Sequence, residues 1–149
     1  MRPGLVLALQ SSESVADLLL VVDPDGDLRR IYAAHFTQAG FEVRCAATIA
    51  EAAALLDGTP FDALIADVRD GESGAEGDRP FVDRLLRARA RVVVLTAYGE
   101  PSWAETAARL RVDAFLHKPA SLVWLEEFLR SRIDQSRRLG EAAPVAATG

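Results

Sequence analysis

Four short hydrophobic runs in this chain each end in one isolated polar side chain that is suited to chemistry. These four side chains are Asp23, Asp67, Thr96 and Lys118. Two carboxylates, a hydroxyl and an amine are the groups that hold a divalent metal ion and neutralise a phosphoryl group. If the fold brings the four together, the sequence predicts a site for phosphoryl transfer.

The elements that must position these side chains are strands. The hydrophobic runs are continuous, bounded by turn residues and separated by helix-like stretches, as in parallel strands buried on both faces. We expect five strands, at residues 17–22, 42–45, 61–66, 91–96 and 113–117. Polar residues at the carboxyl ends of parallel strands lie at one edge of the sheet. The pattern therefore predicts an α/β fold with a doubly wound, five-stranded parallel sheet and helices on both faces.

Capping residues and turn signals predict the helices between these strands. Asp27 is expected to cap a helix that ends near Gln38, before Gly40. The other expected helices are 49–56 after a Thr48/Glu51 capping box, 79–89 after Asp78, 101–110 from Pro101, and 122–138 after Ser121. Residues 68–78 are polar and rich in glycine, which indicates a mobile loop.

Length and composition bound the remaining possibilities. The 149 residues favour one folded domain at 17–138, with a flexible extension at 1–16 and a disordered tail at 139–149. The net charge of −5 argues against a nucleic-acid surface over the whole domain. Cys45 is the only cysteine, and no apolar stretch is long enough to span a bilayer. We expect a cytoplasmic protein without membrane contact; a secretory signal in Leu5–Leu9 is the weaker alternative.

Together these residues resemble the receiver domain of two-component response regulators, over residues 17–138. The match consists of Asp23 after the first strand, Asp67 after the third, Thr96-Ala97 after the fourth and Lys118-Pro119 after the fifth. The resemblance implies a flavodoxin-like sheet with strand order 2-1-3-4-5. It also implies that Asp67 is the phosphoacceptor, with Lys118 and Thr96 as catalytic partners of the phosphoryl oxygens.

The resemblance implies further roles around Asp67. Mg²⁺ would be held by Asp23, Asp67 and the backbone carbonyl of Arg69. Thr96 and Phe115 would be the switch residues, and the Lys118-Pro119 bond would be cis. No organic cofactor is expected.

One departure from the family affects the metal site. The family usually has two adjacent acids after the first strand, whereas this chain has Asp23-Pro24-Asp25. Pro24 has no side-chain oxygen, so Mg²⁺ binding is expected to be weaker. Asp25 is a candidate replacement ligand, one position further into the loop. The turn after Asp67 also departs from the family, because Asp70-Gly71 replaces the usual Met-Pro.

The leading functional prediction is a phosphoacceptor domain in a phosphorelay. It would take a phosphoryl group from a histidine kinase or a phosphotransfer protein and then change its affinity for a downstream protein target. It would not be an enzyme, apart from contributing to its own phosphorylation and dephosphorylation. A weak homodimer through the face formed by the fourth helix, fifth strand and fifth helix is also expected.

Three alternatives remain beside this prediction. Pro24 favours a pseudo-receiver, an interaction module that does not use Mg²⁺-dependent phosphorylation. A flavodoxin-like cofactor binder is disfavoured, because the loop at 23–27 is acidic and offers few backbone donors for a phosphate. Direct DNA binding by the basic end of the last helix is disfavoured too, since cations there complement the helix dipole.

Overall fold

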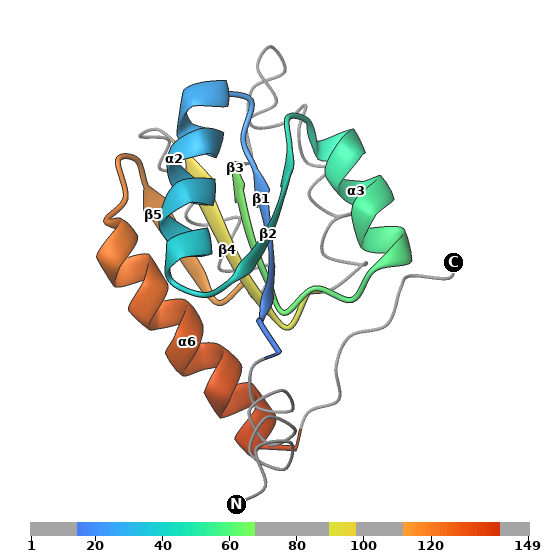
Figure 1. Ribbon diagram of the computed structural model, residues 1–149, viewed down its shortest axis with the longest axis vertical. Helices are drawn as coiled ribbons and strands as arrows, with labels where there is room; N and C mark the ends of the chain where they lie inside the picture. Colours follow the sequence, from blue (N-terminus) through green and yellow to red (C-terminus); the bar gives the residue numbers. More distant parts are fainter. Residues whose placement is uncertain (1–14, 68–89, 98–111, 141–149) are drawn as a thin grey trace, which may run out of the picture.

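A five-stranded parallel sheet forms the centre of the computed structural model, which describes residues 15–67, 90–97 and 112–140 (Figure 1). Its strands are β1 (Leu18–Val22), β2 (Glu42–Ala46), β3 (Ala63–Asp67), β4 (Val92–Ala97) and β5 (Ala114–His117). They lie in the order β2-β1-β3-β4-β5, and every neighbouring pair is parallel. The predicted fold class and strand order are confirmed, with each strand boundary within two residues of the prediction.

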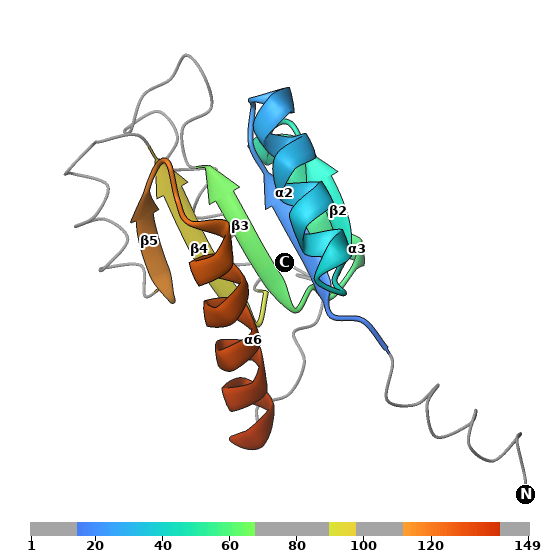
Figure 2. The same ribbon diagram turned by 60° about the vertical axis from the view of Figure 1, so that its left-hand side comes forward.

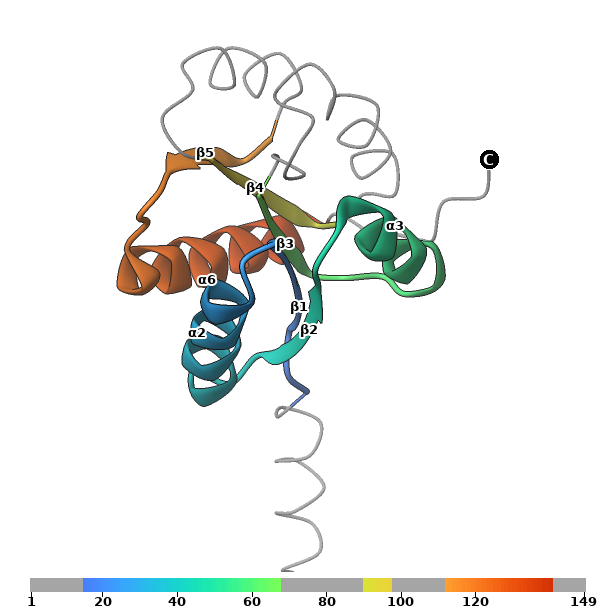
Figure 3. The same cartoon turned by 90° about the horizontal axis from the view of Figure 1, so that it is seen from above.

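Helices cover both faces of the sheet. The helices α2 (Gly26–Gln38) and α6 (Leu122–Arg138) lie on one face, and α3 (Ile49–Gly58) lies on the other (Figure 3). The two helices expected at 79–89 and 101–110 fall outside the described residues, as do the loop 68–78, residues 1–14 and residues 141–149. Within the described ranges, no helix has both the length and the apolar character needed to cross a membrane.

Alternation along the strands divides the core into two layers. Leu19 and Val21 of β1 pack with α2 and α6, whereas Leu20 and Val22 pack with α3. This division follows from the two-residue period of a strand, which sends successive side chains to opposite faces. Because both faces are covered, β1, β3 and β4 are hydrophobic up to their polar carboxyl-end residues, which explains the continuous runs in the sequence. The edge strand β2 is different, since it contains the exposed residues Glu42 and Arg44.

Side-chain caps begin the three described helices. Thr48 accepts a hydrogen bond from Glu51 N, and Ser121 accepts one from Trp124 N, as predicted. The prediction that Asp27 caps α2 is wrong. Asp25 is the cap, because its backbone is extended and its Oδ1 accepts from the N–H groups of Asp27 and Leu28.

Polar contacts join α2 to α6, which also share one apolar layer of the core. His35 Nε2 lies 3.0 Å from Glu126 Oε1, and Arg130 donates to the carbonyl of Ala39 one helical turn further along. The Arg130 guanidinium also lies 5.0 Å from the ring centre of Phe41. The two helices therefore run side by side in the same direction (Figure 1).

Candidate functional site

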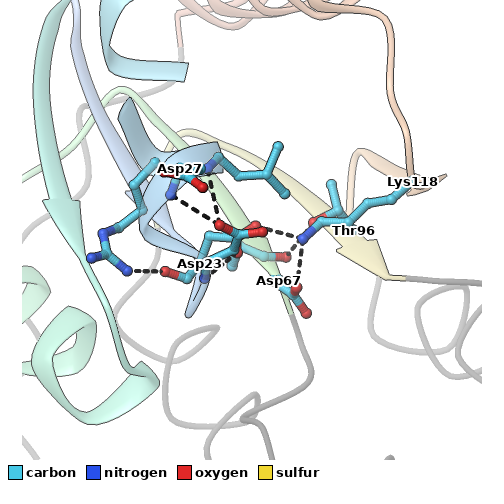
Figure 4. Close-up of polar contacts among 9 residues, drawn as sticks. Asp23, Asp27, Asp67, Thr96 and Lys118 are labelled. Atoms are coloured by element: carbon cyan, nitrogen blue, oxygen red, sulfur yellow. Dashed lines mark hydrogen bonds and ion pairs between the residues drawn. The ribbon is translucent and has the colours of Figure 1, made fainter. Parts of the chain in front are cut away.

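Three charged side chains from distant parts of the sequence meet at the carboxyl edge of the sheet (Figure 4). Lys118 Nζ lies 2.5 Å from Asp23 Oδ2 and 2.6 Å from Asp67 Oδ2. All three side chains are buried, with 2% of Lys118 and 1% of Asp23 exposed. Buried charges are stable only when they are paired in this way. The cluster is therefore one ammonium group shared by two carboxylates.

The strand order brings these residues together. Asp23 follows β1, Asp67 ends β3, and these two strands are direct neighbours. Lys118 follows β5, which is two strands away from β3, and its long side chain reaches back to the two carboxylates. The Lys118-Pro119 bond is cis, as the resemblance implied.

Thr96 lies beside Asp67 in the sheet. The register of β3 and β4 pairs these two residues, and Thr96 is buried. Its hydroxyl donates to the carbonyl of Ala66 at 3.4 Å. The hydroxyl is thus held next to the phosphoacceptor candidate by a long hydrogen bond, which is weak and easily exchanged for a better acceptor.

A network of backbone contacts holds the loop after β1. Asp23 N donates to the carbonyl of Ala46 at 3.1 Å, and Asp23 Oδ1 accepts from Asp25 N at 2.8 Å. Arg29 Nη1 donates to the carbonyl of Asp23 at 2.6 Å. Sequence reasoning missed Arg29, and nothing in the sequence distinguishes it from the neighbouring Arg30. Its place in the first turns of α2 lets it reach back over the loop.

The two remaining candidate metal ligands do not join the cluster in the described structure. Asp25 is exposed and uses Oδ1 to cap α2. Arg69 lies outside the described residues. Pro24 is exposed at the position where the family usually has its second acid. Among the described residues, no group of three or more acidic, histidine or cysteine side chains is placed to hold a metal ion.

Phe115, the second candidate switch residue, is partly buried on the α3 side of the sheet. Its ring packs edge-on against His117 with 5.4 Å between ring centres. The ring is thus packed against the edge of the core, and its role as a switch residue stays a prediction.

Burial and pairing act in opposite directions on the charged cluster. Burial raises the pKa of Asp23 above its ordinary value, although the hydrogen bonds from Lys118 and Asp25 N lower it. For Lys118, burial alone lowers the pKa, but hydrogen bonds to Asp23 and Asp67 outweigh it and raise the pKa. Lys118 is thus charged at neutral pH, and with both carboxylates ionised the cluster carries a net charge of about −1.

The sequence of this chain matches one protein family and several of its members. Residues 19–130 match the family described as the response regulator receiver domain. The photosynthetic apparatus regulatory protein RegA of Cereibacter sphaeroides is 34% identical over 120 residues, covering 80% of this chain. The chain spans 62% of the length of that protein.

Solved structures of response regulators have the same fold as this chain. A CheY-like response regulator receiver domain protein from Methanospirillum hungatei superimposes with a TM-score of 0.75 at 18% identity, covering 84% of this chain and 99% of that one. A response regulator from Burkholderia pseudomallei, which contains a phosphorylated aspartic acid and a calcium ion, superimposes with a TM-score of 0.67 at 20% identity. This match covers 83% of this chain and 72% of that one.

Proposed function

This chain belongs to the response regulator receiver domain family of two-component signalling, and from that premise we propose that it accepts a phosphoryl group on Asp67. The observation that carries the proposal is the position of Lys118 Nζ, 2.6 Å from Asp67 Oδ2, with the Thr96 hydroxyl on the neighbouring strand. A nucleophilic carboxylate, a cation and a hydroxyl donor are thus adjacent before any phosphoryl group arrives.

The proposed reaction is transfer from a phosphohistidine of a partner. A carboxylate oxygen of Asp67 forms a bond to phosphorus while the bond from phosphorus to the donor's imidazole nitrogen breaks, giving an acyl phosphate. Such transfers depend mainly on positioning and on neutralising the phosphoryl oxygens. Lys118 provides a positive charge at this position, and Thr96 provides a hydrogen bond.

A divalent cation fits the donor set only in part. Receiver domains generally bind Mg²⁺ in an acidic pocket, where the ion neutralises charge on the phosphoryl oxygens. Here Asp23 and Asp67 offer hard carboxylate oxygens, and the carbonyl of Arg69 is the third proposed ligand. Pro24 removes one carboxylate, and the capping role of Asp25 opposes its use as a replacement. We therefore propose a weak Mg²⁺ site.

The proposed output is a change of the protein-binding surface formed by the helix expected at 101–110, β5 and α6. Once Asp67 is phosphorylated, the Thr96 hydroxyl would leave the carbonyl of Ala66 for a phosphoryl oxygen. Phe115 would then turn inward into the space beside it, which is a shift between two packings of one domain. The proposed partners are a histidine kinase or phosphotransfer protein, a downstream protein, and a second copy that binds weakly.

The test is phosphorylation by acetyl phosphate with and without Mg²⁺, followed by intact-mass measurement. Wild type should gain the mass of one phosphoryl group, and Asp67→Asn should gain none. Asp57→Asn is the matched control, because Asp57 is an exposed acid at the end of α3 and should not affect the reaction. Equal labelling of Asp67→Asn and wild type would refute the assignment of Asp67.

Pro24 supports a second candidate, the pseudo-receiver that keeps the fold but does not use Mg²⁺-dependent phosphorylation. The same experiment separates the two, provided that a histidine kinase is also tried as donor. Absence of label in wild type, together with label in Pro24→Asp, would favour the pseudo-receiver. Label in wild type that requires Mg²⁺ would rule it out.

A further inference from the structure

The backbone of Asp23 is held at both of its hydrogen-bonding groups. Asp23 follows β1 at the carboxyl edge of the sheet, where α2 also begins (Figure 2). Its N–H donates to the carbonyl of Ala46 at 3.1 Å. Its carbonyl accepts from Arg29 Nη1 at 2.6 Å, which is a charge-assisted hydrogen bond. The strand β2 therefore fixes one peptide plane of Asp23, and α2 fixes the other.

Pro24 makes the contact from Arg29 important for this loop. Proline has no backbone N–H, so the carbonyl of Asp23 is the only hydrogen-bonding group in the peptide unit that joins Asp23 to Pro24. A hydrogen bond can hold this peptide plane only through that oxygen, and Arg29 supplies such a bond. The orientation of the plane thus depends on a side chain of α2.

Arg29 itself is placed firmly enough to hold the loop. It lies in the first turns of α2, whose inner face buries Tyr32 and Phe36 in the core. Its backbone N–H donates to the carbonyl of Asp25 at 3.0 Å, so the residue also contacts the far end of the loop. Its guanidinium lies over Gly26, because a Cβ at that position would be 3.4 Å from Nη2. The side chain of Arg29 is therefore partly buried against the loop.

On the basis of the phosphoryl transfer proposed above, we propose that Arg29 is a positioning residue for the site around Asp67. When the N–H and the carbonyl of Asp23 are both fixed, the direction of its Cα–Cβ bond is fixed as well. That bond aims the carboxylate, whose Oδ2 lies 2.5 Å from Lys118 Nζ and whose Oδ1 accepts from Asp25 N at 2.8 Å. Arg29 thus acts on the phosphoacceptor through Asp23 and Lys118.

Loss of the hydrogen bond from Arg29 would let the peptide plane after Asp23 rotate. Asp23 and Asp67 share the ammonium group of Lys118, so a small displacement of one carboxylate changes how that group is divided between them. Reacting groups must be held to within about 0.5 Å, and a displacement of about 1 Å can lower a rate by about 100-fold. We therefore expect the rate of phosphorylation to depend on Arg29.

The first experiment measures, by intact mass, the rate at which acetyl phosphate labels the full chain at a fixed Mg²⁺ concentration. Arg29→Met should slow labelling by about tenfold. Arg29→Lys keeps a cationic donor and should restore the rate to within about threefold of wild type. Arg30→Met is the matched control, because Arg30 is the next arginine of α2, is exposed and pairs with Asp27. It should be labelled within about twofold of the wild-type rate.

Three results of this experiment would overturn the role of Arg29. The first is a wild-type rate in Arg29→Met. The second is equal slowing in Arg29→Met and Arg30→Met, which would mean that any loss of positive charge from α2 has the same effect. The third is a rate in Arg29→Lys as low as that in Arg29→Met, since a donor to the carbonyl of Asp23 would then be irrelevant.

The second experiment does not depend on phosphorylation. The ¹H–¹⁵N NMR signal of the Lys118 ammonium group, recorded without a phosphoryl donor, should shift in Arg29→Met and stay unchanged in Arg30→Met. An unchanged signal in Arg29→Met would overturn the proposal. If no donor labels the wild type, the proposed function fails, and this signal still decides whether Arg29 positions Asp23. If Arg29→Met perturbs amides throughout the sheet, Arg29→Gln replaces it in both experiments.

Discussion

Lys118 shows how one residue can serve both stability and chemistry. Its ammonium group lies between two buried carboxylates, so removing it would leave like charges facing each other in a region shielded from water. Breaking a buried ion pair by deleting one partner costs more than the pair contributes when intact, because the remaining charge keeps its desolvation penalty. The residue therefore has a structural role that precedes any phosphoryl transfer.

We predict that Lys118→Met lowers the free energy of unfolding by about 3 kcal/mol at pH 7. Urea denaturation of the wild type and the variant measures this difference. Adding Asp23→Asn to Lys118→Met should recover part of this loss. Asp23 and Asp67 would otherwise face each other as two buried carboxylates, and the second substitution makes one of them neutral. Arg138→Met, which removes an exposed helix pair, should change stability by less than about 0.5 kcal/mol. A loss in Lys118→Met no larger than in this control would contradict the prediction.

The pH dependence of stability follows from the same pair. The pKa of Lys118 is raised in the folded state, so its contribution is fully present below its ordinary value of 10.5 and is lost as pH rises through the higher folded value. Burial raises the pKa of Asp23, so ionising Asp23 opposes folding as pH rises above 3.8. In Lys118→Met, no neighbouring ammonium group offsets the cost of ionising the buried Asp23 carboxyl.

We therefore predict that the stability difference between wild type and Lys118→Met is largest near neutral pH. It should shrink as pH falls through the raised pKa of Asp23, where that carboxylate takes up a proton, and again as pH rises above 10.5 through the raised pKa of Lys118. Urea unfolding at a series of pH values tests this. A difference that stays constant from pH 4 to pH 11 would show that the loss comes from packing alone.

Pro24 is the other informative residue, because a single substitution restores the acid that the family usually has. We predict that Pro24→Asp raises Mg²⁺ affinity at least tenfold, a difference of about 1.4 kcal/mol. Isothermal titration calorimetry measures the affinity. Asp25→Ser, which keeps a side-chain oxygen for the cap, should leave Mg²⁺ affinity unchanged, and a clear loss in that variant would identify Asp25 as a ligand.

At the scale of elements, the sequence predicted the starts of two of the three described helices correctly and misplaced the third. The Thr48 and Ser121 caps were predicted because each is a single hydroxyl residue before a helical pattern. The start of α2 was misplaced because the segment 23–27 contains three acids, each with an oxygen suited to capping. The choice among them depends on where the chain leaves β1, and only the loop geometry decides that.

We predict that Asp25→Ala lowers the free energy of unfolding by about 1 kcal/mol, the usual cost of losing a cap. Asp27→Ala should cost less than about 0.5 kcal/mol, since Asp27 contributes only a favourable charge in the first turn and an exposed pair with Arg30. Urea denaturation of both variants tests the order. The reverse order would restore Asp27 as the cap.

At the scale of the whole molecule, hydrophobic runs and strand-end residues were sufficient to predict the parallel sheet and the meeting of Asp23, Asp67 and Lys118. The ion pairs at the opposite end were not predictable. Arg137, for example, pairs with Asp17, which is 120 residues away in the sequence. Surface arginines and aspartates have no periodic pattern that identifies their partners, so such contacts emerge only from the folded structure.

The proposed weak Mg²⁺ site leads to a prediction for the stability of the domain. If the dissociation constant for Mg²⁺ is above about 10 mM, then 10 mM Mg²⁺ adds at most about 0.4 kcal/mol of stability. For a domain of this size the melting temperature should rise by no more than about 3 °C. Differential scanning fluorimetry measures the shift, with Pro24→Asp as the comparison. A rise of about 10 °C in the wild type would show that the site is intact without the second acid.

The sharing of one ammonium group between Asp23 and Asp67 also couples two events at the site. In the proposed reaction, the single negative charge of Asp67 would be replaced by a phosphoryl group with nearly two negative charges. Lys118 would be drawn toward that group. Asp23 would then lose its counter-ion at the moment when the phosphoryl group most needs neutralising. At equilibrium, binding of a metal cation at Asp23 and phosphorylation of Asp67 would thus favour each other by the same factor.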